Sequence, residues 1–106
     1  MTMPTEWLDL AALDALWDGA GMAVHAGGVE VALFRIGDAV YATDNLCTHG
    51  HARLCEGFID GHDIECPLHQ GRFDVRTGTA TGAPATEALK TWPVRIEGGR
   101  VFISLG

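Results

Sequence analysis

CTHGH (47–51) and CPLHQGRFD (66–74) are the two stretches of this sequence that decide its fold. Each begins with a cysteine that is followed closely by a histidine: Cys47 by His49, and Cys66 by His69. Sixteen residues separate His49 from Cys66, which is enough chain for a hairpin between the two stretches. If the stretches lie side by side, they supply two thiolates and two imidazoles. The pattern therefore predicts a four-ligand metal site.

The grouping of these ligands indicates which metal they bind. Structural zinc sites usually take paired cysteines from one segment and paired histidines from another. Here each segment gives one of each, which is unusual for a zinc finger. A Rieske-type [2Fe–2S] cluster needs two thiolates on one iron and two imidazoles on the other. The pattern favours that cluster, and a zinc-stabilised interaction module without a redox role is the alternative.

Short strands and tight turns are predicted for most of the sequence. Apolar and β-branched runs predict strands at 29–36, 39–43, 63–66, 92–97 and 100–104. Glycine-containing pairs between strands predict two-residue hairpin turns at 27–28, 37–38, 60–61 and 98–99. One helical turn is predicted within 10–19, with Leu10, Leu13 and Trp17 on one side. These elements predict an all-β fold, a small antiparallel sandwich or barrel.

Charge limits the possible partners. The chain has 14 acidic and 7 basic residues, a formal net charge of −7. That field repels a phosphate backbone, so we expect no nucleic-acid partner. Arg53, Arg72 and Arg76 flank the two ligand segments, either as ordinary exposed side chains or as a basic rim that orients docking.

Length and cysteine content indicate one cytoplasmic domain. The 106 residues suffice for a single modest core. No apolar run approaches the roughly 18 residues that span a bilayer, and the first residues carry no export signal. Three cysteines do not suit a disulfide framework. We therefore expect a cytoplasmic protein with no membrane partner.

The residues around the ligands resemble the Rieske ferredoxin family in two stretches, YATDNLCTHG (41–50) and IECPLHQGRFDV (64–75). The likeness is strongest to the ferredoxins of bacterial aromatic-ring-hydroxylating dioxygenase systems of the naphthalene type. It implies a single all-β Rieske domain over 1–106, with a two-loop cluster-binding subdomain at one tip, at about 44–84. It also implies one [2Fe–2S] cluster, with these protein ligands: Cys47 and Cys66 on the buried iron, His49 and His69 on the outer iron.

A third cysteine and a third histidine lie near these ligands. His51 fits a surface histidine, and the alternative is a place beside the cluster where it tunes the potential. Cys55 fits a partly buried structural thiol, because nothing near it completes a second site. By the family resemblance, Gly82-Ala83-Pro84 fills the place of a proline-containing loop that covers the cluster.

The resemblance also bears on the reduction potential. High-potential Rieske proteins carry a disulfide between the loops, a serine and a tyrosine near the cluster. At the matching positions this chain has Ala52 and Leu68 for the disulfide, Gly71 for the serine and Phe73 for the tyrosine. The chain thus lacks the disulfide, the serine and the tyrosine, which predicts a reduction potential at the low end of the Rieske range.

The function implied is that of a soluble one-electron carrier rather than an enzyme. Both irons of such a cluster are fully ligated, so no position is open for a substrate. The resemblance implies two partners, a flavoprotein ferredoxin reductase that supplies electrons and a terminal Rieske-type oxygenase that receives them. A small Rieske subunit of another redox enzyme, such as a nitrite reductase, is the alternative within the same cofactor class. The carrier does not contact the aromatic compound, so its sequence holds no pocket for it.

Overall fold

The computed structural model describes residues 7–47, 52–68, 70–83 and 85–105. The first half of the chain forms β1 (Leu8–Ala12), the 3-10 turn η1 (Leu13–Ala15), β2 (Ala20–Ala26), β3 (Val29–Ile36) and β4 (Ala39–Asp44). The second half forms the 3-10 turn η2 (Leu54–Glu56), β5 (Phe58–Asp60), β6 (Asp63–Glu65), β7 (Arg72–Asp74), β8 (Ala80–Gly82), β9 (Thr91–Trp92), β10 (Val94–Glu97) and β11 (Arg100–Ile103). The fold is all-β, as the sequence predicts.

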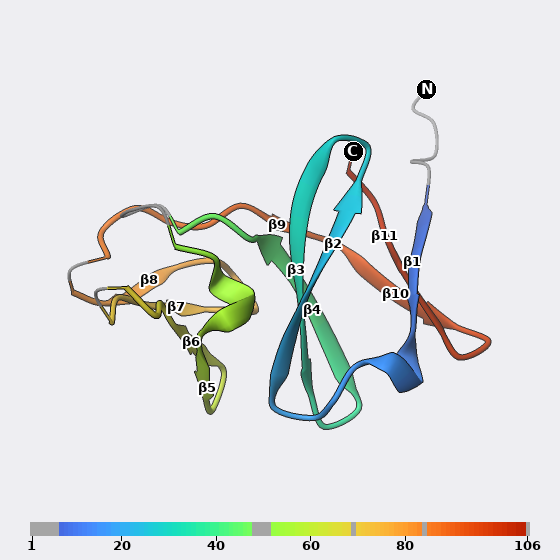
Figure 1. Cartoon of the computed structure of the whole chain (residues 1–106), viewed down its shortest axis with the longest axis horizontal. Helices are drawn as coiled ribbons and strands as arrows, with labels where there is room; N and C mark the ends of the chain where they lie inside the picture. Colours follow the sequence, from blue (N-terminus) through green and yellow to red (C-terminus); the bar gives the residue numbers. More distant parts are fainter. Residues whose placement is uncertain (1–6, 48–51, 69, 84, 106) are drawn as a thin grey trace.

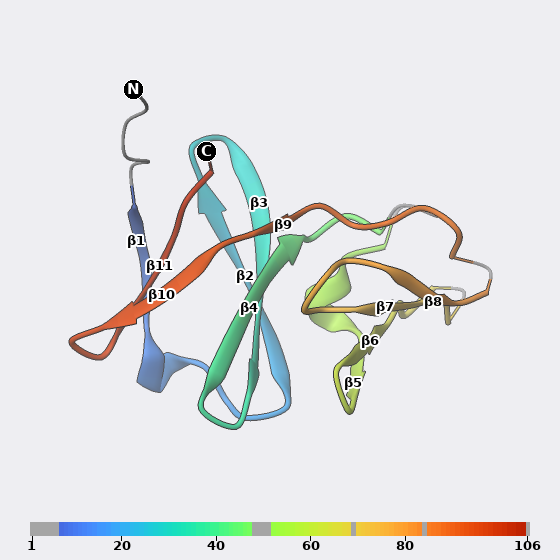
Figure 2. The same ribbon diagram turned by 180° about the vertical axis from the view of Figure 1, so that it is seen from behind.

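The strands form three antiparallel sheets. Their strand orders are β1-β11-β10, β2-β3-β4-β9 and β5-β6-β7-β8. The small sheet β5–β8 lies on one side of β2–β4, and β1, β10 and β11 lie on the other side (Figures 1 and 2). Within the part of the chain that the structure describes, no helix is long and apolar enough to cross a membrane.

Strand β3 belongs to the hydrophobic core on both of its faces. Residues 31–34 have no exposed surface. Successive side chains of a strand point to opposite faces. Val31 and Leu33 accordingly pack with Trp92 and toward β11 of the sheet β1-β11-β10. Ala32 and Phe34 pack toward the small sheet. This explains why 29–36 is a nearly continuous apolar run instead of an alternating one.

Gly21 in β2 lets the backbone of η2 pack closely against the sheet β2-β3-β4-β9. A Cβ built on Gly21 would lie 2.8 Å from the Phe34 ring and 3.0 Å from the backbone of Cys55. Leu54, at the start of η2, is fully buried in the same core as Phe34. Cys55 is partly buried against this core, as the sequence predicts.

Most of the predicted strands and turns are confirmed, and three details differ. The turn between β5 and β6 is Gly61-His62, because Asp60 pairs with Asp63. The predicted strand 92–97 is divided at Pro93, which has no N–H for a ladder hydrogen bond.

The third difference concerns the predicted helical turn within 10–19. Only Leu13–Ala15 forms a helical turn, of the 3-10 type, and Leu10 lies in β1 instead. The Trp17 side chain is 78% exposed, so the expected apolar side of a helix is wrong. The strand is favoured here because Leu8–Ala12 pairs with β11.

Candidate iron–sulfur site

Cys47 lies at the start of the first ligand loop, just beyond β4. The backbone N–H of Cys47 donates to the carbonyl oxygen of Ala52 at 3.0 Å. Leu46 and Arg53 form an antiparallel bridge one step closer to the sheet. The two arms of the loop are thus paired, and they carry Cys47 into the interior, where it is 3% exposed.

Cys66 occupies the matching place in the second loop, directly after β6. Its N–H donates to the carbonyl oxygen of Gly71 at 2.7 Å, and its own carbonyl accepts from the N–H of Gln70 at 3.0 Å. These bonds close residues 66–71 as the loop of the β6–β7 hairpin. Cys66 is 1% exposed.

Gln70 has a backbone conformation that few side chains adopt. Its φ of 63° lies in the left-handed region, which costs a non-glycine residue about 1–2 kcal/mol. Such strain persists only where surrounding contacts hold it, and it is frequent at functional sites. No signal in the sequence indicates this feature, because glycine is the usual residue at a positive φ.

The fold brings the two cysteines into one core cluster. Cys47 and Cys66 both pack there with Phe73 and Leu54. None of the three cysteines, all of which the structure describes, forms a disulfide. Buried thiols from two adjacent hairpin loops fit the inner iron of a Rieske-type cluster, which takes two thiolates as ligands.

The predicted histidine ligands His49 and His69 lie outside the described residues, as does His51. Among the residues that are described, no group of three or more His, Cys, Asp or Glu side chains is placed to hold a metal ion. The four-ligand set therefore stays a prediction, and the two thiols are the part of it that the fold brings together.

The segment after β8 packs against the second loop. A Cβ built on Gly71 would lie 3.0 Å from the Ala85 Cβ, and Ala85 is buried. The N–H of Ala85 donates to the carbonyl oxygen of Gly82 at 3.1 Å, which forms a tight turn. Pro84, the proline of the predicted covering loop, lies outside the described residues.

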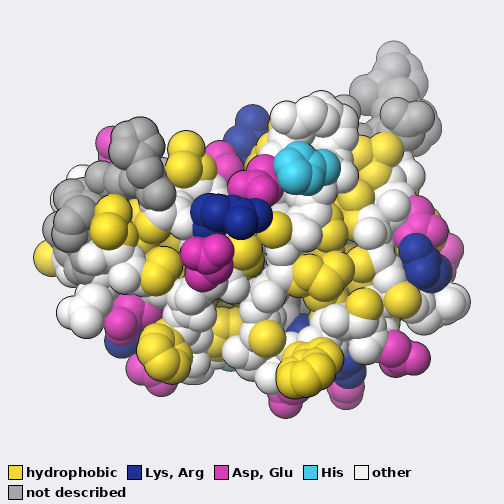
Figure 3. Space-filling view, viewed as in Figure 1, with side chains coloured by type: hydrophobic (Ala, Val, Ile, Leu, Met, Phe, Trp, Pro, Cys, Tyr) yellow, Lys and Arg dark blue, Asp and Glu magenta, His cyan; other side chains and the backbone are white. Residues whose placement is uncertain are grey.

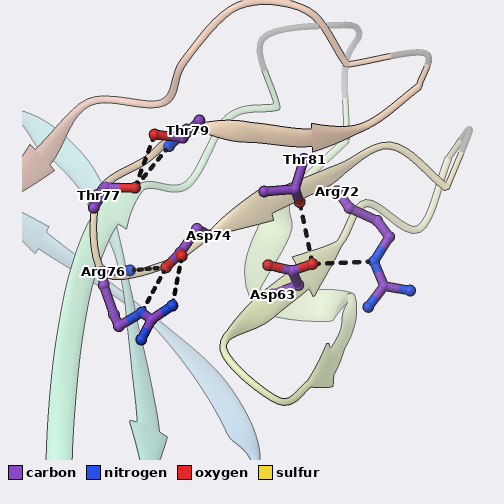
Figure 4. Close-up of polar contacts among 7 residues, drawn as sticks. All are labelled: Asp63, Arg72, Asp74, Arg76, Thr77, Thr79 and Thr81. Atoms are coloured by element: carbon purple, nitrogen blue, oxygen red, sulfur yellow. Dashed lines mark hydrogen bonds and ion pairs between the residues drawn. The ribbon is translucent and has the colours of Figure 1, made fainter.

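Polar contacts hold the outer face of the small sheet together (Figure 4). Asp63 and Asp74 lie directly opposite each other on β6 and β7, an unfavourable pairing of like charges. Asp63 is offset by Arg72 at 3.5 Å and by the Thr81 hydroxyl at 3.1 Å. Asp74 accepts from the Arg76 side chain at 2.8 and 3.0 Å. This pairing with Arg76 lowers the pKa of Asp74.

The three arginines beside the loops are all ion-paired. Arg53 lies 2.7 Å from a Glu30 oxygen, and Arg76 lies 2.8 Å from Asp74. Arg72 is 2.8 Å from Asp60, with Asp63 and Glu65 within 3.6 Å. Basic and acidic side chains also lie next to each other on the face seen in Figure 3. Arg53 and Arg76 are therefore exposed and Arg72 is half-buried, each with acidic partners, and a role of these arginines in orienting docking stays a prediction.

A shallow groove separates the two loops on the surface. Its volume is about 280 Å³, and it is lined by Ala52, Arg53, Glu56, Pro67 and Leu68. Leu68 is 52% exposed, so this surface offers an apolar side chain beside a neutralised guanidinium.

Comparisons with known proteins agree with this description. The family described as Rieske [2Fe-2S] domain matches residues 6–93. The chain is 53% identical over 103 residues to the ferredoxin component of a naphthalene 1,2-dioxygenase system from Pseudomonas aeruginosa, covering 97% of this chain and 99% of the relative.

Two solved structures have the same fold over nearly the whole chain. The ferredoxin of carbazole 1,9a-dioxygenase from Nocardioides aromaticivorans IC177 superposes with a TM-score of 0.91 at 39% identity, covering 94% of this chain and 98% of that one. A complex of reduced oxygenase and oxidized ferredoxin in carbazole 1,9a-dioxygenase contains a chain with a TM-score of 0.88 and 38% identity, with 95% and 94% covered.

An all-β chain with two buried thiols at adjacent hairpin loops is the scaffold of a small iron–sulfur electron carrier. The chain belongs to the Rieske [2Fe-2S] domain family, and it carries one Rieske-type cluster. It is a ferredoxin, the electron-transfer component of an aromatic dioxygenase system rather than the catalytic enzyme. The zinc-stabilised module is thereby excluded.

Proposed function

We propose that this ferredoxin passes single electrons in the cytoplasm from a flavoprotein reductase to the terminal oxygenase of a naphthalene-type dioxygenase system. The observation that carries the proposal is the shared burial of Cys47 and Cys66 at the ends of two adjacent loops. The 53% identity to a ferredoxin component of this type supports the choice of system over a nitrite reductase subunit.

In this proposal residues of about 44–84 form the cluster-binding subdomain within one domain of residues 1–106. Cys47 and Cys66 hold the inner iron, and His49 and His69 hold the outer one. These four residues would hold the cluster, which when bound would supply one-electron transfer. The residues of the chain act by excluding water from the thiolates, since both cysteines are at most 3% exposed.

The groove between the loops is the described surface that fits a docking face. Its exposed Leu68 and the ion-paired Arg53 favour a small contact at the groove itself. Charged side chains around it, such as Arg72 and its acidic partners, act on the encounter rate. Weak electron-transfer encounters bury less surface than stable complexes, which permits rapid exchange between two partners. We propose that reductase and oxygenase both approach this side of the molecule.

Reconstitution tests the function. Purified flavoprotein reductase with a reduced nicotinamide as electron donor, terminal oxygenase and naphthalene are combined with and without this ferredoxin, and the consumption of naphthalene and oxygen is measured. Turnover is expected only when the ferredoxin is present. A Cys66→Ala variant is expected to support no turnover, whereas Cys55→Ala, which changes a thiol with no assigned ligand role, retains it. Equal turnover without the ferredoxin would contradict the proposal.

A further inference from the structure

Asn45 is a buried polar residue at the base of the first ligand loop. It follows β4 and precedes Cys47 by two positions. The side chain has no exposed surface, although asparagine is a residue type usually found at the surface. A buried amide requires hydrogen-bond partners, because an unpaired one is costly.

Asn45 makes hydrogen bonds in three directions. Its N–H donates to the carbonyl oxygen of Glu30 in β3 at 3.2 Å. Its carbonyl oxygen accepts from the N–H of Leu54 at 2.7 Å. Its side-chain Oδ1 accepts from the N–H of Cys55 at 2.8 Å. One residue thus joins the outgoing arm of the loop, the returning arm and the central strand of the core.

The ion pair of Glu30 with Arg53 lies near the side-chain amide of Asn45. The Glu30 carboxylate accepts from Arg53 at 2.7 Å, and Arg53 belongs to the returning arm. The pKa of Glu30 is lowered by Arg53 first and by the Asn45 amide second. The Asn45 amide thus lies near this carboxylate, although its Nδ2 makes no hydrogen bond among the described residues.

We propose that Asn45 is a positioning residue for the first ligand loop, fixing through Oδ1 the distance between the arms that present Cys47. The proposal rests on Cys47 being a ligand, as proposed above. Two backbone hydrogen bonds pair the arms, from the Cys47 N–H to Ala52 and from the Leu54 N–H to Asn45. The Asn45 side chain adds a third, because its Oδ1 accepts from the N–H of Cys55, the next residue along the returning arm. Without it, the Cys55 N–H is left unpaired and the returning arm is less restrained.

The test measures how firmly the cluster is held in Asn45→Ala. Removing the acceptor of a buried N–H is expected to speed iron loss to a chelator by roughly tenfold to a hundredfold. The electron paramagnetic resonance lines of the reduced protein are expected to broaden, because the thiolate then samples a range of positions. A general loss of stability alone would leave the linewidth unchanged.

Two further variants make the test specific. Asn45→Asp keeps an oxygen that accepts from the Cys55 N–H, and it is made together with Glu30→Gln so that no second carboxylate faces the first. This variant is expected to lose iron more slowly than the Ala variant. Thr43→Val removes another fully buried polar group, from the end of β4 just before Asn45; among the described residues its hydroxyl donates to the neighbouring Asp44 carbonyl. This control is expected to keep the wild-type linewidth and rate of iron loss.

Each outcome of these measurements either supports the proposal or overturns it. Faster iron loss and broader lines in Asn45→Ala, with smaller changes in Asn45→Asp and Thr43→Val, support the proposal. Iron loss in Asn45→Ala within about twofold of the wild type would overturn it, as would changes of equal size in Thr43→Val. If Asn45→Ala assembles no cluster, Asn45→Asp decides, and equal failure there overturns the proposal. None of these measurements uses the oxygenase, so failure of the proposed electron delivery would be seen separately.

Discussion

Gly71 and Ala85 lie so close together that a Cβ on Gly71 would be 3.0 Å from the Ala85 Cβ and 3.2 Å from its backbone nitrogen. Gly71 also accepts a hydrogen bond from the Cys66 N–H at 2.7 Å. The second ligand loop is therefore fixed between β6 and the segment that follows β8. The residue at position 71 cannot grow without moving one of them.

We predict that Gly71→Ser, which introduces the serine of high-potential Rieske proteins, lowers the free energy of unfolding by about 1–3 kcal/mol. The crowding atoms belong to a buried alanine and its backbone, which do not move aside easily. Urea unfolding measures the change. Gly82→Ala is the control, because the three atoms nearest its Cβ, at 3.1–3.2 Å, all belong to the Arg72 side chain, whose outer part can turn aside. An equal or larger loss in the control would contradict this account.

The ligand assignment predicts the results of four single substitutions. Changing Cys47, His49, Cys66 or His69 to Ala is expected to abolish the cluster, because an iron then lacks one of its two protein ligands. The two loops lose their crosslink, while the sheets of the body stay folded. Iron analysis and electron paramagnetic resonance check this, with His51→Ala as the control. A native signal in His49→Ala together with its loss in His51→Ala would identify His51 as the ligand.

The ion pairs around Arg72 lead to a prediction about docking. Arg72→Glu would place a fourth carboxylate beside Asp60, Asp63 and Glu65, creating a strongly acidic patch next to the second loop. We expect electron transfer to the oxygenase to slow as salt rises, and Arg72→Glu to change its rate more than Asp14→Arg does. Charge at the rim of an interface acts mainly on the encounter rate. Stopped-flow reduction of the oxygenase at several ionic strengths checks this, and rates indifferent to both salt and charge would contradict it.

The sequence predicts local structure well where a turn or an apolar run is self-contained. The run 29–36 matches β3 residue for residue, and three of the four glycine-containing turns lie where expected. The strand Leu8–Ala12 was missed because its pairing with β11 joins the two ends of the chain. No local pattern reports such a long-range contact.

The ligand spacing in the sequence predicts which residues form the site, but not how the loops are held. No sequence pattern indicates Asn45, because its bonds to Glu30, Leu54 and Cys55 depend on tertiary pairing. The ion pairs of Arg53 with Glu30 and of Arg72 with Asp60 depend on tertiary pairing in the same way. Arg76 differs, because its partner Asp74 lies two positions before it in the chain.

The lowered pKa of Asp74 predicts a dependence of stability on pH. Arg76 favours the charged carboxylate in the folded state, so this stabilisation is present above the unfolded pKa of about 3.9. It is lost as pH falls through the lowered folded pKa. Asp74→Asn is expected to be less stable at pH 7 by about 1 kcal/mol, and this difference should shrink in acid. Urea unfolding across this range checks it, with the exposed Asp38→Asn as the control. A difference that grows in acid would contradict the assignment.

Phe73 links the fold of this ferredoxin to its reduction potential. It is fully buried in the core cluster that holds Cys47 and Cys66, and its aromatic ring offers no hydrogen-bond donor. Ala52 and Leu68 cannot form a disulfide, and Gly71 has no side chain to donate. Hydrogen bonds to the cluster sulfurs raise the potential. We therefore predict a midpoint near the low end of the Rieske range, roughly −150 mV, which suits electron uptake from a reduced flavin.

Phe73→Tyr is predicted to raise this midpoint, because the added hydroxyl stabilises the negative charge that arrives on reduction. Voltammetry of the two proteins measures the shift. Phe58→Tyr is the matched control: it adds the same hydroxyl to a ring that is 76% exposed, where water already solvates it, and should leave the potential unchanged. Equal shifts in the two variants would contradict a local effect. A wild-type midpoint well above zero would require a different donor to the sulfurs, and backbone N–H groups of the two loops would then be the groups to examine.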